Sequence, residues 1–175
     1  TRRKLEIKFP ERSIQECLNY LQISPDDIGA VAVSTSDFAK TLARVFPSTK
    51  EDYYMIRRRK KNPGVFSSLK KRSKYFMTEI GSSSVTKSMS EKCIRASLKK
   101  LGFQEYDLHF IDHHFCHAAS AFLSGFNECL VFTIDGIGDA LSGTISTLRQ
   151  GKLSREASLS GKHSLGIFFE QVTKL

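Results

Sequence analysis

Residues 113–139, HHFCHAASAFLSGFNECLVFTIDGIGD, combine a histidine-rich helix start, an apolar strand and an acidic glycine turn. His113 and His117 are spaced i, i+4, so both rings lie on one face of a helix and can reach a single metal ion. Asp112 is well placed to cap this helix, and the positive end of the helix dipole disfavours protonated imidazole there. We interpret the two histidines as a pair of metal ligands.

The histidine segment also has other readings. A helical histidine pair is common as a structural or surface feature, and His114 or Cys116 could ligate in place of a neighbour. Successive residues of a helix are rotated by about 100°, so His114 points away from the face that His113 and His117 share. Geometry therefore favours the i, i+4 pair.

An apolar run over 130–134 predicts a buried strand, which leads directly into the pentapeptide DGIGD at 135–139. Ligand sites of α/β sheets gather at the carboxyl ends of strands. The alternating residues 141–148 predict a second strand, so DGIGD is interpreted as a tight turn between two strands. Gly136 and Gly138 would let backbone N–H groups approach phosphate oxygens. Taken alone, the motif is equally typical of an ordinary hairpin.

The composition fits one domain. The chain has 175 residues, of which 40% are hydrophobic, which is enough to bury a core. No apolar run approaches the roughly 18 residues that cross a membrane, and no signal sequence opens the chain. Four cysteines without Cys-x-x-Cys spacing favour a reducing, cytoplasmic environment over a zinc knuckle or a redox pair.

The positive charge is concentrated in one segment. The net charge is +9, and nine Lys and Arg residues without an acidic residue lie between Arg57 and Lys74. We interpret this region, about 53–76, as a basic insert that forms a solvated, helical hairpin on the surface. An electrostatic guide for anionic ligands is the sharper alternative, and nucleic-acid binding is the minor one.

Alternating helices and strands predict an α/β fold with at least partly parallel pairing. Two capping boxes, Ser13–Glu16 and Ser88–Glu91, predict helix starts, and Ser164 is a suitable N-cap for a helix near the end. The remaining expected elements are strands at 29–34 and 108–111, a helix at 36–46 and a polar loop at 81–86.

Three blocks together resemble a known family. They are HHFCHAASAF at 113–122, VFTIDGIGDALSGTIS at 131–146 and HSLGIFFEQVT at 163–173, and the opening residues 1–21 extend the likeness. In this order they resemble the O-carbamoyltransferases of the nodulation-protein type and of the cephamycin and tobramycin type. The resemblance covers nearly the whole chain and is weakest between residues 38 and 91.

The resemblance implies part of an actin/hexokinase/Hsp70-like (ribonuclease H-like) ATPase domain. Such enzymes use carbamoyl phosphate and ATP to form a carbamoyl-adenylate. They pass the carbamoyl group to a hydroxyl of a small natural-product acceptor, with a divalent metal, iron first, at the transfer site. Matched by position, the family's metal ligands are His113, His117 and Asp135, and its nucleotide or phosphate side is Gly136, Gly138 and Asp139.

Further residues are weaker candidates. His114, just off the metal face, is a candidate general base. Arg3 and Lys4 match a basic pair of the family, and His163 and Ser164 border the implied cleft, where they could contact substrate. Compared with the family, the chain lacks the first hairpin, the second half of the domain and the adenylate-forming domain. We expect a fragment of a longer enzyme that is inactive alone.

Two classes of alternative stay open. The first is another enzyme of the same fold, either a transferase resembling the tRNA threonylcarbamoyl transferases or a kinase. A kinase has no need of the histidine pair, whereas the basic insert would suit a tRNA enzyme. The second is a non-enzymatic module that binds nucleic acid through residues 57–74. Carbamoyl phosphate, ATP and a small hydroxylated acceptor are the expected partners, and neither nucleic acid nor a membrane is.

Overall fold

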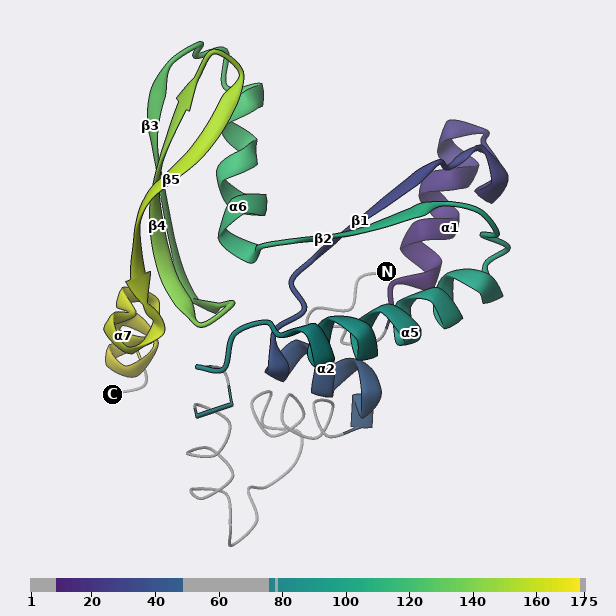
Figure 1. Ribbon diagram of the computed structural model, residues 1–175, viewed down its shortest axis with the longest axis horizontal. Coiled ribbons are helices and arrows are strands. Elements are labelled where there is room, and N and C mark those ends of the chain that lie inside the picture. Colours follow the sequence, from purple (N-terminus) through teal and green to yellow (C-terminus); the bar gives the residue numbers. More distant parts are fainter. Residues whose placement is uncertain (1–8, 49–75, 78, 174–175) are drawn as a thin grey trace, which may run out of the picture.

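The computed structural model describes residues 9–48, 76–77 and 79–173. Within these residues the chain forms a two-stranded parallel sheet and a three-stranded antiparallel sheet, so the predicted α/β class with partly parallel pairing is confirmed. Figure 1 shows the two sheets in separate parts of the molecule, joined by the segment that leads from β2 into α6. The strands are β1 (Ala30–Ser34), β2 (Asp107–Ile111), β3 (Cys129–Gly138), β4 (Leu141–Arg149) and β5 (Lys152–Ser160).

Five α-helices accompany the sheets in the described residues, with three short 3-10 turns. The helices α1, α2 and α5 belong to the β1–β2 part, whereas α6 and α7 lie beside the antiparallel sheet (Figure 1). Their bounds are α1 (Glu11–Leu21), α2 (Phe38–Val45), α5 (Ser84–Lys100), α6 (His113–Ala118) and α7 (Leu165–Val172), and the 3-10 turns are η1 (Pro25–Asp27), η2 (Ala119–Leu123) and η3 (Gly161–His163).

The β1–β2 part has its own apolar core. Strand β1 pairs in parallel with β2, from Ala30 opposite Asp107 to Ser34 opposite Ile111. Ile94 and Leu98 of α5 are buried together with Phe103, and one face of the strand pair packs against them. Because both strands run the same way, their carboxyl ends meet at one edge, which faces the second part of the molecule.

The antiparallel sheet has a second, smaller core. The strand order is β3-β4-β5, and α6 with η2 lies against it. Buried Ala118 and Ala121 contribute small side chains, and Leu148 and Leu153 fill the sheet side. The small residues after the histidines therefore let the helix approach the sheet closely, which brings the first turn of α6 near the end of β3.

The expected burial of the apolar run in β3 is only half right. Leu130, Phe132 and Ile134 are 62%, 63% and 64% exposed, whereas Val131 packs against the core and Thr133 is buried. Strand side chains alternate between faces. Strand β3 is an edge strand; helix α6 packs on the face of Val131 and Thr133, while the side chains of Leu130, Phe132 and Ile134 on the other face are exposed.

The tight turn lies later than predicted. Strand β3 continues through the glycines to Gly138, with a register irregularity between Ile134 and Gly138. The turn residues are Asp139 and Ala140, with φ of 51° and 65°. Two positive φ values in a two-residue connection match the right-handed twist of a hairpin. The strand–turn–strand prediction therefore holds, but the glycines belong to the strand.

Both predicted capping boxes are wrong. Helix α1 begins at Glu11 after Pro10, so Ser13 lies inside its first turn. Helix α5 begins at Ser84, inside the expected polar loop, and Ser83 with Thr86 forms the actual box. Several serines precede α5, and only the tertiary packing of its buried residues decides which one caps it.

Several sequence predictions fall on other residues. Arg3, Lys4 and the basic insert at 53–76, apart from Phe76, lie outside the described residues.

Among the helices that the structure describes, none combines the length and the apolar character needed to span a bilayer.

Candidate metal centre

Three ligand atoms converge where α6 meets the end of β3. His113 and His117 stand one turn apart on α6, and Asp135 comes from the irregular end of β3. The Nε2 atom of His113 lies 2.6 Å from Oδ2 of Asp135 and 3.1 Å from Nε2 of His117. The Nε2 atom of His117 lies 3.7 Å from the same carboxylate oxygen. The structure thus brings together the three residues that were predicted to share an ion.

The three donors fit a divalent transition metal. Bonds of about 2.1 Å at right angles place neighbouring donors about 3 Å apart, and the observed separations run from 2.6 to 3.7 Å. Two imidazoles and one carboxylate would suit a divalent metal such as iron(II) or zinc, and His113, His117 and Asp135 are the residues that would hold it. Side-chain exposure of 54% at His117 and 39% at Asp135 leaves the centre accessible.

The Asp135 carboxylate is held in its charged form. Partial burial raises its pKa, but the hydrogen bonds from His113 and from the Gly136 N–H, together with the electrostatic attraction of His113 and His117, outweigh burial, so the pKa of Asp135 lies below its ordinary value. The Gly136 N–H donates to Oδ1 at 2.5 Å, which leaves Oδ2 to face the histidines. The carboxylate therefore offers a negative, oriented oxygen to a cation.

Gly138 makes room for the ring of His113. A Cβ atom at Gly138 would lie 2.0 Å from Cδ2 of His113, a distance that no side chain could accept. At Gly136, by contrast, a Cβ would meet nothing within 4 Å. The second glycine of the motif thus has a steric role beside the histidine, which the sequence interpretation had not included.

His114 has a different environment from its neighbours. It is fully buried, with Nδ1 2.9 Å from the Thr133 hydroxyl and Nε2 3.1 Å from the Leu141 carbonyl. A carbonyl only accepts, so Nε2 carries the proton and Nδ1 accepts from Thr133. Neither ring nitrogen is left for a substrate, and this placement argues against the general-base role. His114 instead joins α6 to β3 and β4.

Asp112 caps α6, as predicted. Its Oδ1 accepts the N–H of Phe115 at 2.9 Å, and Arg155 of β5 forms an ion pair with it. Cys116 is exposed, and its Sγ lies 4.0 Å from the Ile111 carbonyl oxygen rather than with the metal donors. The open alternatives for the ligand set are thereby reduced to the i, i+4 pair with Asp135.

Helix α7 packs directly on the carboxylate segment. Ser164 caps α7 by accepting the Ile167 N–H at 3.0 Å, and its hydroxyl donates to the Asp135 carbonyl at 3.2 Å. A Cβ at Gly166 would lie 2.9 Å from that carbonyl oxygen. Ser164 therefore serves as the N-cap, while His163 is exposed at the end of η3.

Asp139 is occupied by protein donors. One oxygen accepts the backbone N–H of His113 at 2.7 Å, and the other accepts the hydroxyl of Thr35. The sequence interpretation placed Asp139 on the phosphate side and overlooked Thr35. The position of Thr35 in the sequence could have identified it, because Thr35 directly follows β1, at the carboxyl end of a parallel strand pair, where ligand sites gather.

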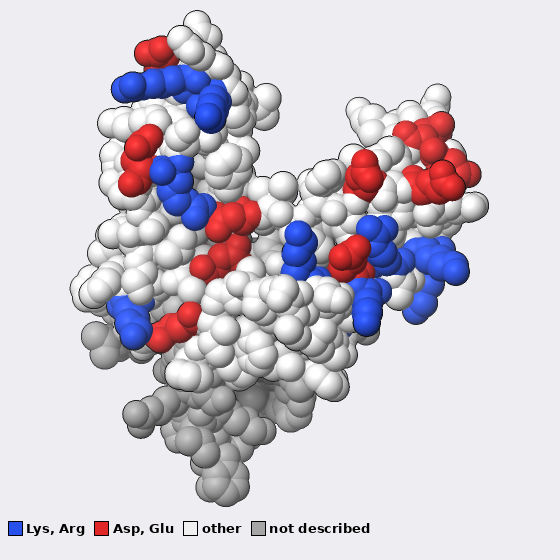
Figure 2. Space-filling model, in the orientation of Figure 1, with Lys and Arg blue, Asp and Glu red and all other residues white. Residues whose placement is uncertain are grey.

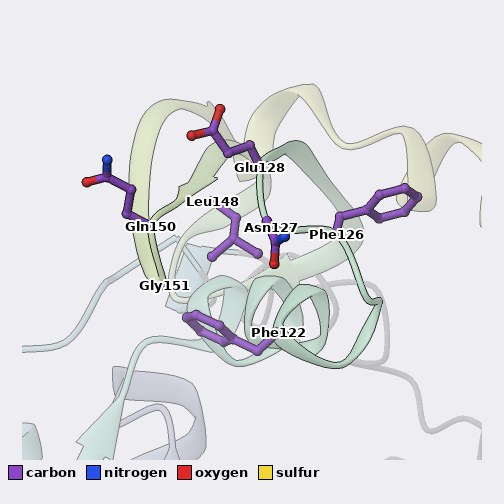
Figure 3. A pocket seen from close by; sticks show the side chains of 7 residues that line it. All are labelled: Phe122, Phe126, Asn127, Glu128, Leu148, Gln150 and Gly151. Carbon is purple, nitrogen blue, oxygen red and sulfur yellow. The ribbon is translucent and has the colours of Figure 1, made fainter.

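Two hollows lie near these elements. One, of about 320 Å³, opens at the carboxyl ends of β1 and β2 and is lined by Thr35, Lys87, Asp112 and Asp139 among others. A larger one, of about 410 Å³, lies between Phe122 and the β4–β5 turn and is seen in Figure 3. Leu148 of this second hollow pairs with Cys129, at the sheet end opposite Gly138. The smaller hollow is the one whose lining includes Asp112 and Asp139, the carboxylates that bond to the first turn of α6.

Acidic side chains gather near the first turn of α6. Figure 2 shows acidic side chains gathered near the middle of the face, where the two parts of the molecule meet. Asp112, Asp135 and Asp139 all bond to α6 or to its histidines. The first turn of this helix is therefore surrounded by carboxylates, which suits a bound cation.

Comparison with known proteins finds a matching family and several relatives. The sequence profile of the family described as Carbamoyltransferase N-terminus matches residues 1–175. The nodulation protein NolNO of Sinorhizobium fredii is 28% identical over 170 residues, which are 95% of this chain and 21% of that protein. NolO of Bradyrhizobium diazoefficiens is 43% identical over 60 residues, which are 34% of the chain and 11% of that protein.

A cyanobacterial protein matches at similar length. An uncharacterised protein of Synechocystis is 26% identical over 174 residues, or 99% of this chain and 26% of that protein. The chain thus spans about a fifth of the length of NolNO and about a quarter of the cyanobacterial relative.

Proposed function

We propose, because this chain belongs to the carbamoyltransferase N-terminus family, that the protein containing it transfers a carbamoyl group to a hydroxyl of a small acceptor. The observation that carries the proposal is the convergence of His113, His117 and Asp135, whose ligand atoms lie within 4.8 Å of one another. The proposed donor substrates are carbamoyl phosphate and ATP, which with water give a carbamoyl-adenylate, phosphate and pyrophosphate. The adenylate then donates its carbamoyl group to the acceptor hydroxyl and releases AMP.

The proposed metal is iron(II), held by His113, His117 and Asp135. When bound, such an ion supplies a Lewis acid that polarises an oxygen and lowers the pKa of a hydroxyl. The protein's own residues prepare this site before any substrate arrives. The depressed pKa of Asp135 keeps its carboxylate charged. The i, i+4 spacing on a capped helix turn sets both imidazole rings toward that carboxylate.

The phosphate of the leaving nucleotide is proposed to lie beside the DGIGD segment. Gly136 presents no side chain and has open space beside it, so a ligand can approach its backbone closely, whereas the ring of His113 fills the space beside Gly138. The Gly136 N–H already donates to the Asp135 carboxylate. The contribution of this segment therefore includes orientation of the carboxylate as well as close approach. The order of a strand–helix–strand unit followed by an antiparallel sheet also supports the proposed ribonuclease H-like ATPase fold.

Metal analysis tests the histidine pair. In the full-length protein we expect His117→Ala to abolish stoichiometric iron uptake and carbamoyl transfer while the circular dichroism spectrum stays unchanged. His109→Ala is the matched control, since His109 is an exposed histidine of β2 outside the site. Retention of one iron per chain by His117→Ala would overturn the assignment.

The acceptor class is tested separately. Full-length protein with labelled carbamoyl phosphate and ATP should label small hydroxylated compounds and leave tRNA unlabelled. Label in tRNA alone would instead identify an enzyme resembling the tRNA threonylcarbamoyl transferases. Phosphorylation of the acceptor without carbamoyl transfer would identify a kinase.

A further inference from the structure

Asp139 connects the two parts of the molecule at the metal centre. Its Oδ2 accepts the backbone N–H of His113 at 2.7 Å, and its Oδ1 accepts the hydroxyl of Thr35. His113 begins α6 beside the antiparallel sheet, whereas Thr35 follows β1 of the parallel pair. One carboxylate therefore joins the end of β1 to the first residue of the histidine helix.

Thr35 is held in a conformation that threonine rarely adopts. Its φ is 58°, in the left-handed region, which is costly for a β-branched residue. The backbone is fixed on both sides, because the Thr35 N–H donates to the Ile111 carbonyl at 2.8 Å and Arg44 donates to the Thr35 carbonyl at 2.8 Å. The hydroxyl also accepts the Asp37 N–H at 3.1 Å. Such overdetermined outliers concentrate at functional sites.

The direction of the Thr35 hydroxyl follows from these bonds. Its lone pair takes the Asp37 N–H, so its own proton is free to donate to Asp139. Thr35 is only 3% exposed, so little of its side chain is open to solvent, although Thr35 and Asp139 both border the hollow at the strand ends. The left-handed backbone at Thr35 thus directs its buried hydroxyl toward the Asp139 carboxylate, which also accepts the backbone N–H of His113.

We infer that Thr35 and Asp139 form a positioning clamp for the metal ligand His113. The inference rests on the proposed metal function of His113, His117 and Asp135. The clamp fixes the backbone of His113, and Gly138 leaves space for the His113 ring on the other side. Because the ring is set from both directions, its Nε2 faces Asp135 without rearrangement when an ion arrives. Neither Thr35 nor Asp139 is proposed to ligate the metal.

Cobalt titration of the full-length, chelator-treated protein tests the clamp. The probe is Co²⁺ alone, followed by its visible d–d absorption, at a temperature where every variant is folded by circular dichroism. Loss of an outer-shell partner of a metal ligand costs roughly 10–100-fold in affinity. We expect a loss of this size for Asp139→Asn and for Thr35→Val. Thr35→Ser retains the hydroxyl and should bind Co²⁺ within about twofold of wild type.

The double variant shows whether the two residues act together. If Thr35 acts through Asp139, Thr35→Val combined with Asp139→Asn should lose little more than Asp139→Asn alone. Additive losses would overturn the clamp. A purely structural role would lower the unfolding temperature and leave Co²⁺ affinity unchanged in the folded variants, and this result would overturn it too.

The controls separate this inference from the proposed function. Failure of the wild-type protein to bind Co²⁺ would refute the metal centre itself. Normal wild-type binding with equally tight binding by Asp139→Asn would refute only the clamp. Should Asp139→Asn fail to fold, the comparison of Thr35→Val with Thr35→Ser decides. Valine keeps the branched shape of threonine and removes the hydroxyl, whereas serine keeps the hydroxyl.

Discussion

At the scale of single residues, the geometry of the candidate metal centre depends on the absence of a side chain at Gly138. The ring of His113 occupies the space where Gly138 would carry a Cβ, at 2.0 Å from Cδ2. The Nε2 atom of that ring is also the one closest to the Asp135 carboxylate. Any atom added at Gly138 must move the ring, and with it a donor atom of the site.

Gly138→Ala should therefore weaken metal binding by about tenfold or more, comparable to the loss of an outer-shell contact. The matched control is Gly136→Ala, two residues earlier in the same strand, where a Cβ has open space within 4 Å. It should bind the metal as wild type does. Co²⁺ titration of the full-length variants measures both, and equal effects of the two substitutions would contradict this account.

At the scale of elements, α5 shows that the residue at which a helix begins depends on more than a local capping sequence. Ser83 accepts the Thr86 N–H, and the Thr86 hydroxyl accepts the Ser83 N–H in return. Ser88 precedes a glutamate at the spacing of a capping box, yet it lies inside α5 and is exposed. The helix extends to Ser84 because Thr86 and Ser90 are buried on its inner side.

Ser83→Ala should lower the free energy of unfolding by about 1 kcal/mol, the usual loss for an N-cap. Ser88→Ala should leave it unchanged or slightly raised, because alanine is the better helix former at an exposed interior position. Urea unfolding of the full-length protein, followed on the transition that includes α5, compares the two. A larger loss for Ser88→Ala would place the helix start where the sequence predicted it.

At the scale of the whole molecule, the described residues form two cores. Ile94, Leu98 and Phe103 are buried in the β1–β2 part, whereas Leu148 and Leu153 are buried in the antiparallel sheet. The donors of the candidate metal centre all belong to the second part, and the contact between Thr35 and Asp139 joins this part to the first. We therefore expect a cavity made in one core to destabilise mainly the part of the molecule that contains it.

Leu98→Ala and Leu148→Ala remove equally buried side chains, both 2% exposed. Each should cost about 2–5 kcal/mol. Hydrogen exchange should show loss of protection in β1 and β2 for Leu98→Ala, and in β3 and β4 for Leu148→Ala. The same pattern of exchange in both variants would mean that the two parts unfold as one unit.

The sequence by itself indicated the three residues of the candidate site and the class of the fold. The spacing of His113 and His117, the cap at Asp112 and the aspartate after an apolar run were sufficient, because helix and strand periodicity are local properties. Local rules also predicted the hairpin, since alternating residues flank it. They placed its turn on the glycines, although Asp139 and Ala140 make it.

Only the tertiary structure decided which of the neighbouring residues are candidate metal donors and which hold the elements together. It buried His114 against Thr133 and Leu141, so this histidine became a packing residue while His113 faced Asp135. It also brought Thr35 to Asp139, 104 positions apart in the chain. Contacts at such separations arise from the packing of whole elements. A pattern read along one strand or helix carries no information about what another element places opposite it.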